Sequence, residues 1–458
     1  MNDMINRTII EPKRSIDVIH ETDVLVVGSG PGGLSAAIAS ARCGVKTTLL
    51  ERFGCFGGNI TVVGVEGFAW YRHEKTIEAG GIGREFEDLA KEMGAAVPES
   101  QSLSYELDSE GFKIVADKLV TDSGIHPMLH RSFSMPIMEG NTIVGVIVES
   151  KAGREAILSK VVIDATGDAD VAFRAGAKIK TMPVEEQMAT SVMFHLAGVN
   201  KKAFLTEIQN NPQSYKDWSD SEWEVETDGK EDDLFSPFIK KPFQEAINDG
   251  LLPSDLKTIG GTWGAVHDTG ELTYMNIIQL SNIDGTNPND LTKGEMEGRR
   301  QAMLAIEALK KYYPGCENAR LRNFGMSIGI RDTRKLDAIY NMAEIDVRNQ
   351  GRFEDSIGIY PEFIDGYGLL IIPTTGRYME LPYRSMIPKN INGLLVTGRA
   401  TGGDKISHAA TRNMSCCSVN GQGAGVAAAT AVKSNRDVKN INIFNVKKEL
   451  EKQGVRMN

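Results

Sequence analysis

The N-terminal part of the chain alternates between apolar runs and a glycine-rich segment in the order typical of a strand, a turn and a helix. Residues 24–27 are continuously apolar, as in a strand that is covered on both faces of a parallel sheet. An alanine-rich stretch without breakers follows at 34–43 and stops at Gly44, which predicts a helix. A second strand is predicted at 45–50 and completes a βαβ unit.

A different pattern occupies residues 131–165. Apolar and polar positions alternate there, and turn residues occur at 139–141 and 152–154, which predicts a small antiparallel meander. The meander returns through 161–163, an apolar run that predicts a buried strand.

The remaining elements are expected from composition and breakers. The apolar run 393–398 predicts another buried strand, and the strongly acidic stretch 217–233 predicts an exposed loop. Stretches that favour helix are 76–98, 293–312 and 414–432.

The length of the chain requires more than one domain, because 458 residues exceed a single ordinary core. The pattern predicts an α/β fold with a Rossmann-like nucleotide-binding domain, in which a parallel sheet carries the antiparallel meander. Residues 1–180 would form the first part of that domain and 376–458 its C-terminal return. We expect 181–375 to form an inserted α+β substrate domain.

Charge and cysteine content narrow the class of protein. A formal net charge of -10 argues against a nucleic-acid partner. The most apolar run, 24–41, is interrupted by a glycine cluster, so we expect no membrane span. Five cysteines make no disulfide framework and no secretory signal is seen, which favours the cytoplasm. The histidines show no metal-ligand spacing, so no metal is expected.

A dinucleotide-binding motif connects the first predicted strand and helix. The sequence Gly28-Ser29-Gly30-Pro31-Gly32-Gly33 fits G-x-G-x-x-G, and Glu51 ends the next strand. In this motif the first glycine allows a sharp turn, the second lets the backbone approach a diphosphate, and the third lets helix and strand pack closely. The helix N-terminus then faces the diphosphate, and the acid accepts hydrogen bonds from ribose hydroxyls.

The residues after Glu51 favour FAD over NAD. Arg52 is followed by a second glycine pair, Gly57-Gly58, and by Asn59. This arrangement resembles the flavoprotein pattern, in which the chain passes back along the diphosphate of an extended FAD.

The chain as a whole resembles the FAD-dependent oxidoreductase family with the glutathione-reductase-like FAD fold, and more distantly fumarate-reductase flavoproteins and thiazole synthases. The motifs that carry this resemblance are the glycine turn with Glu51, 162–168, 329–335, 382–388, 396–399 and 421–425. The resemblance implies that FAD contacts Thr166, Gly167, Gly398 and Arg399. It also implies that the helix containing 421–425 points its N-terminus at the flavin. The expected FAD-binding residues are Gly28, Gly30, Pro31, Gly32, Gly33, Glu51, Arg52, Gly57, Gly58, Asn59, Thr166, Gly167, Gly398, Arg399, Gly421, Gln422, Gly423 and Ala424.

Three residues are candidates for the chemistry beside the flavin. His408 lies between the last strand and the last long helix, and a histidine pKa near neutrality suits an acid or base. Arg331 and Arg412 are candidates to anchor a substrate carboxylate or to stabilise an anionic flavin. A structural role is the alternative for each of the three.

These observations predict an oxidoreductase that transfers a hydride between a small organic substrate and FAD. An external electron acceptor or donor is expected, because no second G-x-G-x-x-G unit offers a nicotinamide site. A lyase or isomerase that holds flavin without net redox chemistry, and an NAD-dependent dehydrogenase, are the alternatives. A homo-oligomer is compatible with the sequence, and the substrate is not readable from it.

Overall fold

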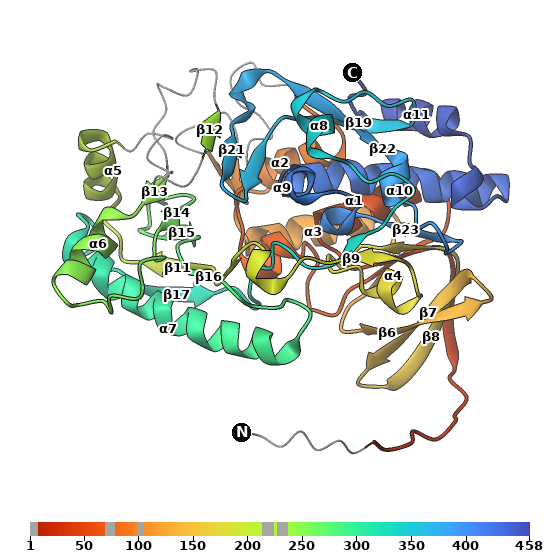
Figure 1. Ribbon diagram of the computed structural model, residues 1–458, viewed down its shortest axis with the longest axis horizontal. Helices are drawn as coiled ribbons and strands as arrows, with labels where there is room; N and C mark the ends of the chain where they lie inside the picture. Colours follow the sequence, from red (N-terminus) through yellow and green to blue (C-terminus); the bar gives the residue numbers. More distant parts are fainter. Residues whose placement is uncertain (1–7, 69–77, 99–104, 213–223, 227–236) are drawn as a thin grey trace.

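A computed structural model of the chain describes residues 8–68, 78–98, 105–212, 224–226 and 237–458. Its central feature within these residues is a seven-stranded sheet with the order β5-β2-β1-β8-β7-β6, in which β23 also pairs with β8 (Figure 1). The strands are β1 (Val18–Val27), β2 (Thr47–Leu50), β5 (His126–Met128), β6 (Ser132–Glu139), β7 (Thr142–Ser150), β8 (Gly153–Asp164) and β23 (Leu394–Val396).

Strand β8 joins the two parts of this sheet because it is long enough to have different neighbours along its two halves. Its first half pairs antiparallel with β7, and its second half pairs parallel with β23, where Leu394 lies opposite Val162. On its other edge β8 runs parallel to β1, with Val27 opposite Asp164. The carboxyl ends of β1, β8 and β23 therefore meet at one edge, and the predicted α/β fold with a parallel sheet and an antiparallel meander is confirmed.

Two long helices pack closely beside this sheet. Helix α1 (Pro31–Arg42) lies against α10 (Met414–Ser434), almost all of which is buried (Figure 1). Glycines on α10 allow the close approach, since a Cβ atom on Gly425 would overlap the carbonyl oxygen of Ala36. Helices α2 (Ile82–Glu92), α3 (Gly111–Asp122) and α11 (Ile443–Lys452) complete this part of the molecule.

A second hydrophobic core defines a separate region, which we call the cap domain. Its buried residues run from Val192 to Ile328 and make no part of the main core. In Figure 1 the cap domain lies to one side of the sheet, with α7 along its lower edge. Its elements are β10 (Thr190–Ser191), β11 (Phe194–Ala197), α5 (Lys201–Asn210), β13 (Phe238–Ile239), α6 (Lys241–Asn248), β14 (Gly261–Thr262), β15 (Leu272–Met275), β16 (Gln279–Leu280), α7 (Pro288–Tyr312) and β17 (Arg320–Phe324).

The inserted domain is shorter than the sequence predicts. Residues between Met342 and Ile372 belong to the main core instead of the cap core. The reason is packing on α10: Ile357 in β19 (Ser356–Pro361) lies against Gly423, where a Cβ would come within 2.5 Å of its side chain. The cap core therefore ends about 45 residues before the expected boundary at residue 375.

Other differences are local. The helix expected at 76–98 is α2, which begins only after Gly80 and Gly81 because both have positive φ. The acidic stretch 217–233 lies outside the described residues except for β12 (Glu224–Glu226), which pairs with β21 (Leu369–Ile371). The remaining elements are β3 (Ala96–Pro98), β4 (Tyr105–Leu107), α4 (Asp170–Arg174), β9 (Ile179–Lys180), β18 (Lys335–Leu336), α8 (Glu344–Arg348), β20 (Ile364–Gly366), β22 (Tyr378–Pro382) and α9 (Lys405–Thr411).

Candidate active site

A cavity of about 1130 Å³ lies between the carboxyl edge of the sheet and the cap domain. One half of its wall comes from the glycine turn after β1 and from the ends of β8 and β23. The other half comes from β14, β15, β16 and the segment 327–331. The volume exceeds the usual range for one drug-sized ligand, so the cavity has room for a large ligand and a second, smaller molecule.

The glycine turn forms a cradle at the cavity wall. Gly30 has φ −61° and ψ 178° and is the N-cap of α1, and a Cβ atom built on it would meet nothing within 4 Å. A Cβ on Gly33 would instead overlap the carbonyl oxygen of Gly28, which explains the tight packing of helix on strand. The start of α1 thus faces open space that no side chain fills, and this geometry suits a diphosphate.

Glu51 is placed beside this cradle by its own hydrogen bonds. Its Oε2 atom accepts from the Ser29 amide at 3.0 Å and the Ser29 hydroxyl at 2.7 Å, and its Oε1 accepts from the Phe53 amide at 3.0 Å. The side chain is buried but lines the cavity. Each carboxylate oxygen can accept further hydrogen bonds, so Glu51 fits the predicted contact with a ribose.

The second glycine pair packs directly against the first turn. The Gly57 amide donates to the Ser29 carbonyl at 3.0 Å, and a Cβ on Gly58 would lie 2.5 Å from the Gly30 Cα. Gly58 and the neighbouring Asn59 line the cavity, as do Arg52, Pro31 and Gly32, whereas Gly57 lies behind the wall. The two glycine segments therefore form a single surface, as the flavoprotein resemblance implies.

The ends of β8 and β23 add a third part to the cofactor half. Thr166, Gly167, Gly398 and Arg399 all line the cavity. Arg399 donates from Nη2 to Asp168 at 2.6 Å, so an ion pair lies where these strands end. Asp168 was not predicted as a site residue, although it follows the end of the buried strand β8 by only four residues.

The four residues 421–424 lie elsewhere. None of them is among the described residues that line the cavity, because they lie two turns inside α10 rather than at its start. A Cβ on Gly421 would overlap the Gly32 carbonyl oxygen, and Gln422 accepts a hydrogen bond from the Ile82 amide at 2.9 Å. The structure thus gives Gly421, Gln422, Gly423 and Ala424 a packing role in place of the predicted FAD contact. The helix start itself does reach the cavity, through Asn413 and Met414.

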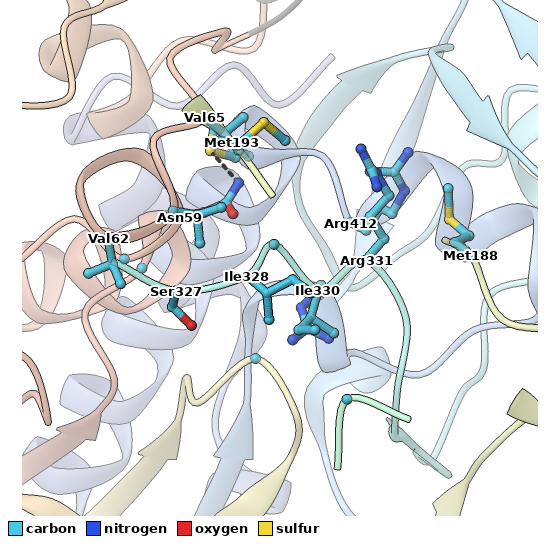
Figure 2. Close-up of a pocket in the computed structure, with 18 of the residues that line it drawn as sticks. Asn59, Val62, Val65, Met188, Met193, Ser327, Ile328, Ile330, Arg331 and Arg412 are labelled. Atoms are coloured by element: carbon cyan, nitrogen blue, oxygen red, sulfur yellow. Dashed lines mark hydrogen bonds between the residues drawn. The ribbon is translucent and has the colours of Figure 1, made fainter. Parts of the chain in front are cut away.

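Arg331 and Arg412 lie beside each other in the cavity wall, where Arg331 belongs to the segment 327–331 and Arg412 directly precedes the start of α10 (Figure 2). Arg331 donates from Nη1 to the Ala189 carbonyl at 2.7 Å and the Ser191 hydroxyl at 2.6 Å, and from Nη2 to Asn276 at 2.9 Å. Arg412 donates to the Asp365 carboxylate at 2.9 Å. Burial and then the neighbouring charge of Arg412 lower the pKa of Arg331 to about 10, so the Arg331 guanidinium is charged at neutral pH.

His408 does not fit the predicted acid or base role. It is 1% exposed and is absent from the described residues of the cavity wall. Its Nε2 donates to the Arg331 carbonyl at 3.0 Å, since a carbonyl oxygen only accepts. Burial and then the charge of Lys335 lower the pKa of His408 to about 3, so it is neutral. We therefore interpret His408 as a residue that holds the backbone of Arg331 in place.

Two tyrosines in the cavity wall were missed by the sequence analysis. Tyr274 and Tyr367 have φ of 52° and 55°, a left-handed conformation that is strained for a residue other than glycine. The Tyr367 hydroxyl donates to Asp332, which also pairs with Lys335. Burial and then Asp332 raise the pKa of Tyr367, so the phenol is protonated. Nothing in the sequence indicates this conformation, because it depends on tertiary contacts.

Glu66 and His195 form a buried pair near Gly67, a residue of the cavity wall. Glu66 Oε1 lies 3.7 Å from His195 Nδ1, and each side chain is 1% exposed. Neither ring nitrogen of His195 has a hydrogen-bond partner among the described residues. Burial raises the pKa of Glu66 to about 7 and lowers that of His195 to about 4, so both groups are mainly neutral near pH 6.

Replacing Glu66 by Gln should remove a pH dependence from the free energy of unfolding. The folded protein keeps the Glu66 proton up to a pKa of about 7, whereas the unfolded chain releases it near 4.5. The resulting stabilisation is complete below pH 4.5 and is lost as the pH rises through 7, by about 3 kcal/mol. Urea unfolding of both proteins at pH 5 and pH 8 measures the difference. His195 is present in both, and parallel pH profiles would contradict the prediction.

Two kinds of site are not seen in the parts of the chain that the structure describes. No group of three or more histidine, cysteine, aspartate or glutamate side chains could hold a metal ion there. No described helix combines the length and apolar character needed to cross a bilayer. Cys417 does line the cavity, but burial raises its pKa to about 12, which disfavours a reactive thiolate.

Part of the chain is similar to thiamine thiazole synthases. The protein of that name from Metallosphaera sedula is 32% identical over 173 residues, which cover 35% of this chain and 60% of the synthase. The one from Saccharolobus solfataricus is 32% identical over 175 residues, which cover 36% of this chain and 62% of the synthase. The matched segments thus span less than two thirds of these relatives' own length.

Solved structures with a similar fold cover more of the chain at lower identity. A geranylgeranyl bacteriochlorophyll reductase-like protein from Thermoplasma acidophilum matches 95% of this chain and 82% of its own, with 14% identity and a TM-score of 0.45. The p-nitrophenol 4-monooxygenase of Pseudomonas putida matches 94% of this chain and 84% of its own, with 12% identity and a TM-score of 0.44.

A match to one protein family extends over nearly the whole chain. The family described as FAD dependent oxidoreductase matches residues 23–450, a range that includes the glycine turn, the cap domain and α10. The match agrees with a cradle that suits a diphosphate and with Glu51 beside it. The protein therefore belongs to the FAD-dependent oxidoreductase family, and its cofactor is FAD.

Proposed function

We propose that this protein is a dehydrogenase or reductase that transfers a hydride between a small organic substrate and FAD. The observation that carries the proposal is the single cavity, which is continuous from the glycine turn to Arg331, Tyr274 and Tyr367. A substrate in the cap half would therefore lie in the same enclosed space as the cofactor. The sequence contains no second G-x-G-x-x-G unit that could bind a nicotinamide cofactor. An external electron donor or acceptor therefore completes the cycle.

In this proposal each part of the wall has a separate task. The bound FAD supplies the ring that accepts or gives the hydride. The start of α1 and Gly30 hold the diphosphate, and Glu51 holds a ribose. Arg331 and Arg412 orient the substrate in the cap half.

Tyr367 is the group that we assign to proton transfer. Its hydroxyl is protonated and lies in the cavity wall, where its oxygen can accept the proton of a substrate hydroxyl while its own proton passes to Asp332. Asp332 fixes the direction of this hydroxyl, and Lys335 compensates the charge of Asp332. Lys405 lies 4.8 Å from the centre of the Tyr367 ring, over its face.

An anaerobic screen tests the proposed function. The purified protein should be yellow, and small acids, alcohols and enones are mixed with it in the absence of oxygen. An oxidisable substrate should bleach the oxidised flavin band; an enone should restore that band after reduction with dithionite. A protein that turns over a compound without any change of the flavin would instead support the lyase or isomerase alternative.

A further inference from the structure

The end of the cavity that contains Arg331 and Arg412, which we call its cationic end, carries positive charge that the neighbouring residues do not balance. Arg331 has no carboxylate within 4.0 Å among the described residues, and its guanidinium donates to the neutral oxygens of Ala189, Ser191, Asn276 and Gln279. A buried charge that lacks a counter-charge is costly, so such groups are normally paired. The missing partner of Arg331 is therefore expected to come from a ligand.

Arg412 increases this imbalance. Asp365 is the acid that pairs with it, and the buried Nε of Arg412 has no hydrogen-bond partner in the described part of the chain. Two guanidinium groups thus share one carboxylate, which leaves a net charge of about +1 at this end of the cavity. In Figure 2 the two arginines lie beside each other, with Met188 next to them.

We propose that Arg331 and Arg412 bind the carboxylate of a monocarboxylic acid, which would be the substrate of the hydride transfer proposed above. The inference rests on that proposed function for the substrate's role. A guanidinium binds a carboxylate with two parallel N–H donors, and one negative charge balances the net charge of the pair. A phosphate monoester carries nearly two charges, and Asp365 would repel the excess.

The surroundings of Arg331 place this site on the substrate side of the cavity. The side-chain groups that hold its guanidinium are Ser191 in β10, Asn276 after β15 and Gln279 in β16, and all three belong to the cap domain. The glycine turn and the ends of β8 and β23 lie in the other half of the wall. Arg331 is therefore positioned by the domain that does not form the cofactor cradle, which favours a substrate anchor over a contact with the flavin.

An apolar wall next to the arginines indicates the rest of the substrate. Met188 and Ile330 lie next to the arginines, and Ile328 continues this wall (Figure 2). Such side chains pack against hydrocarbon groups and offer no hydrogen bonds to hydroxyl groups. The geometry thus favours an acid with an apolar body over a polyhydroxylated acid.

Paired probes test the carboxylate site on the unchanged, FAD-bound protein. Benzoate and butyrate are compared with benzamide and butyramide, which have the same shapes without the charge, and inorganic phosphate is a further probe. Calorimetry measures binding, and the change of the flavin absorption band reports whether the probe lies near the ring. At least one acid should bind at least tenfold more tightly than its amide and than phosphate.

Variants connect this binding to the named residues. Arg331→Met should weaken binding of the acid at least tenfold and leave binding of the amide unchanged. Arg384→Met is the matched control, because Arg384 pairs with Asp355 and is not part of the described cavity wall. If Arg331→Met does not fold, the comparison of acid with amide on the unchanged protein still tests whether the cavity binds a carboxylate.

Two outcomes would overturn the inference: equal binding of acid and amide in both pairs, including no binding of either, or tighter binding of phosphate. The FAD content is measured separately, by release on denaturation. A protein without FAD would contradict the family assignment and the proposed function, while calorimetry with acids and amides would still test the anion site.

Discussion

Gly30→Val should give a folded protein that no longer retains FAD. The backbone of Gly30 is extended, with φ −61°, and a Cβ there meets no protein atom within 4 Å, so valine fits without strain. Its methyl groups would occupy the cradle at the start of α1 and keep the diphosphate away from the backbone amides. Losing one or two charged hydrogen bonds, at about 1.5–3 kcal/mol each, lowers FAD affinity by at least about 100-fold. Flavin content after purification and fluorescence titration with FAD measure this loss.

Gly33→Val separates the loss of cofactor from the loss of fold. A Cβ on Gly33 overlaps the Gly28 carbonyl oxygen, so this variant should fail to fold or should unfold at a much lower denaturant concentration. Gly30→Val should keep the circular dichroism spectrum of the unchanged protein stripped of FAD. Normal flavin stoichiometry in Gly30→Val would show that the diphosphate does not lie over Gly30.

The sequence predicts the first βαβ unit well because its geometry is local. The glycine turn, α1 and Glu51 lie within one short segment, and steric rules for glycine fix their arrangement. Short apolar runs also locate the end of β8 and β23, whose carboxyl ends then complete the cofactor half. This part of the site needs no knowledge of distant contacts.

Residues that depend on tertiary contacts could not be assigned in the same way. A glycine inside a helix can allow a ligand to approach or allow a neighbouring helix to pack closely, and the sequence does not distinguish the two. The packing of α10 on α1 shows that the second role applies to Gly421. The sequence suggests an ordinary pKa for His408, because it does not show that the side chain is buried beside the Arg331 carbonyl and the charge of Lys335. The cap core ends at Ile328, before the predicted boundary at residue 375, and the packing of β19 on α10 is a contact of the same kind.

Tyr367→Phe should leave FAD bound and slow the hydride transfer by about 10²–10⁴, the usual contribution of a general acid or base. The substitution removes only the hydroxyl, and phenylalanine can keep the left-handed backbone at φ 55° as tyrosine does. Asp332 still pairs with Lys335 in the variant, so the neighbouring charges stay balanced. Anaerobic stopped-flow absorbance of the flavin band, with a substrate found in the screen, measures the rate.

Tyr340→Phe is the matched control for this variant. The Tyr340 hydroxyl also donates to an aspartate, Asp346 at 2.7 Å, but Tyr340 is not among the described residues of the cavity wall. Loss of a tyrosine–aspartate hydrogen bond as such should therefore leave the rate of flavin reduction unchanged. If Tyr367→Phe reduces its flavin as fast as Tyr340→Phe does, Tyr367 passes on no proton in the rate-limiting step. The proton of the substrate must then go to another group in the cavity or to solvent, while Arg331 and Arg412 keep their separate role in binding.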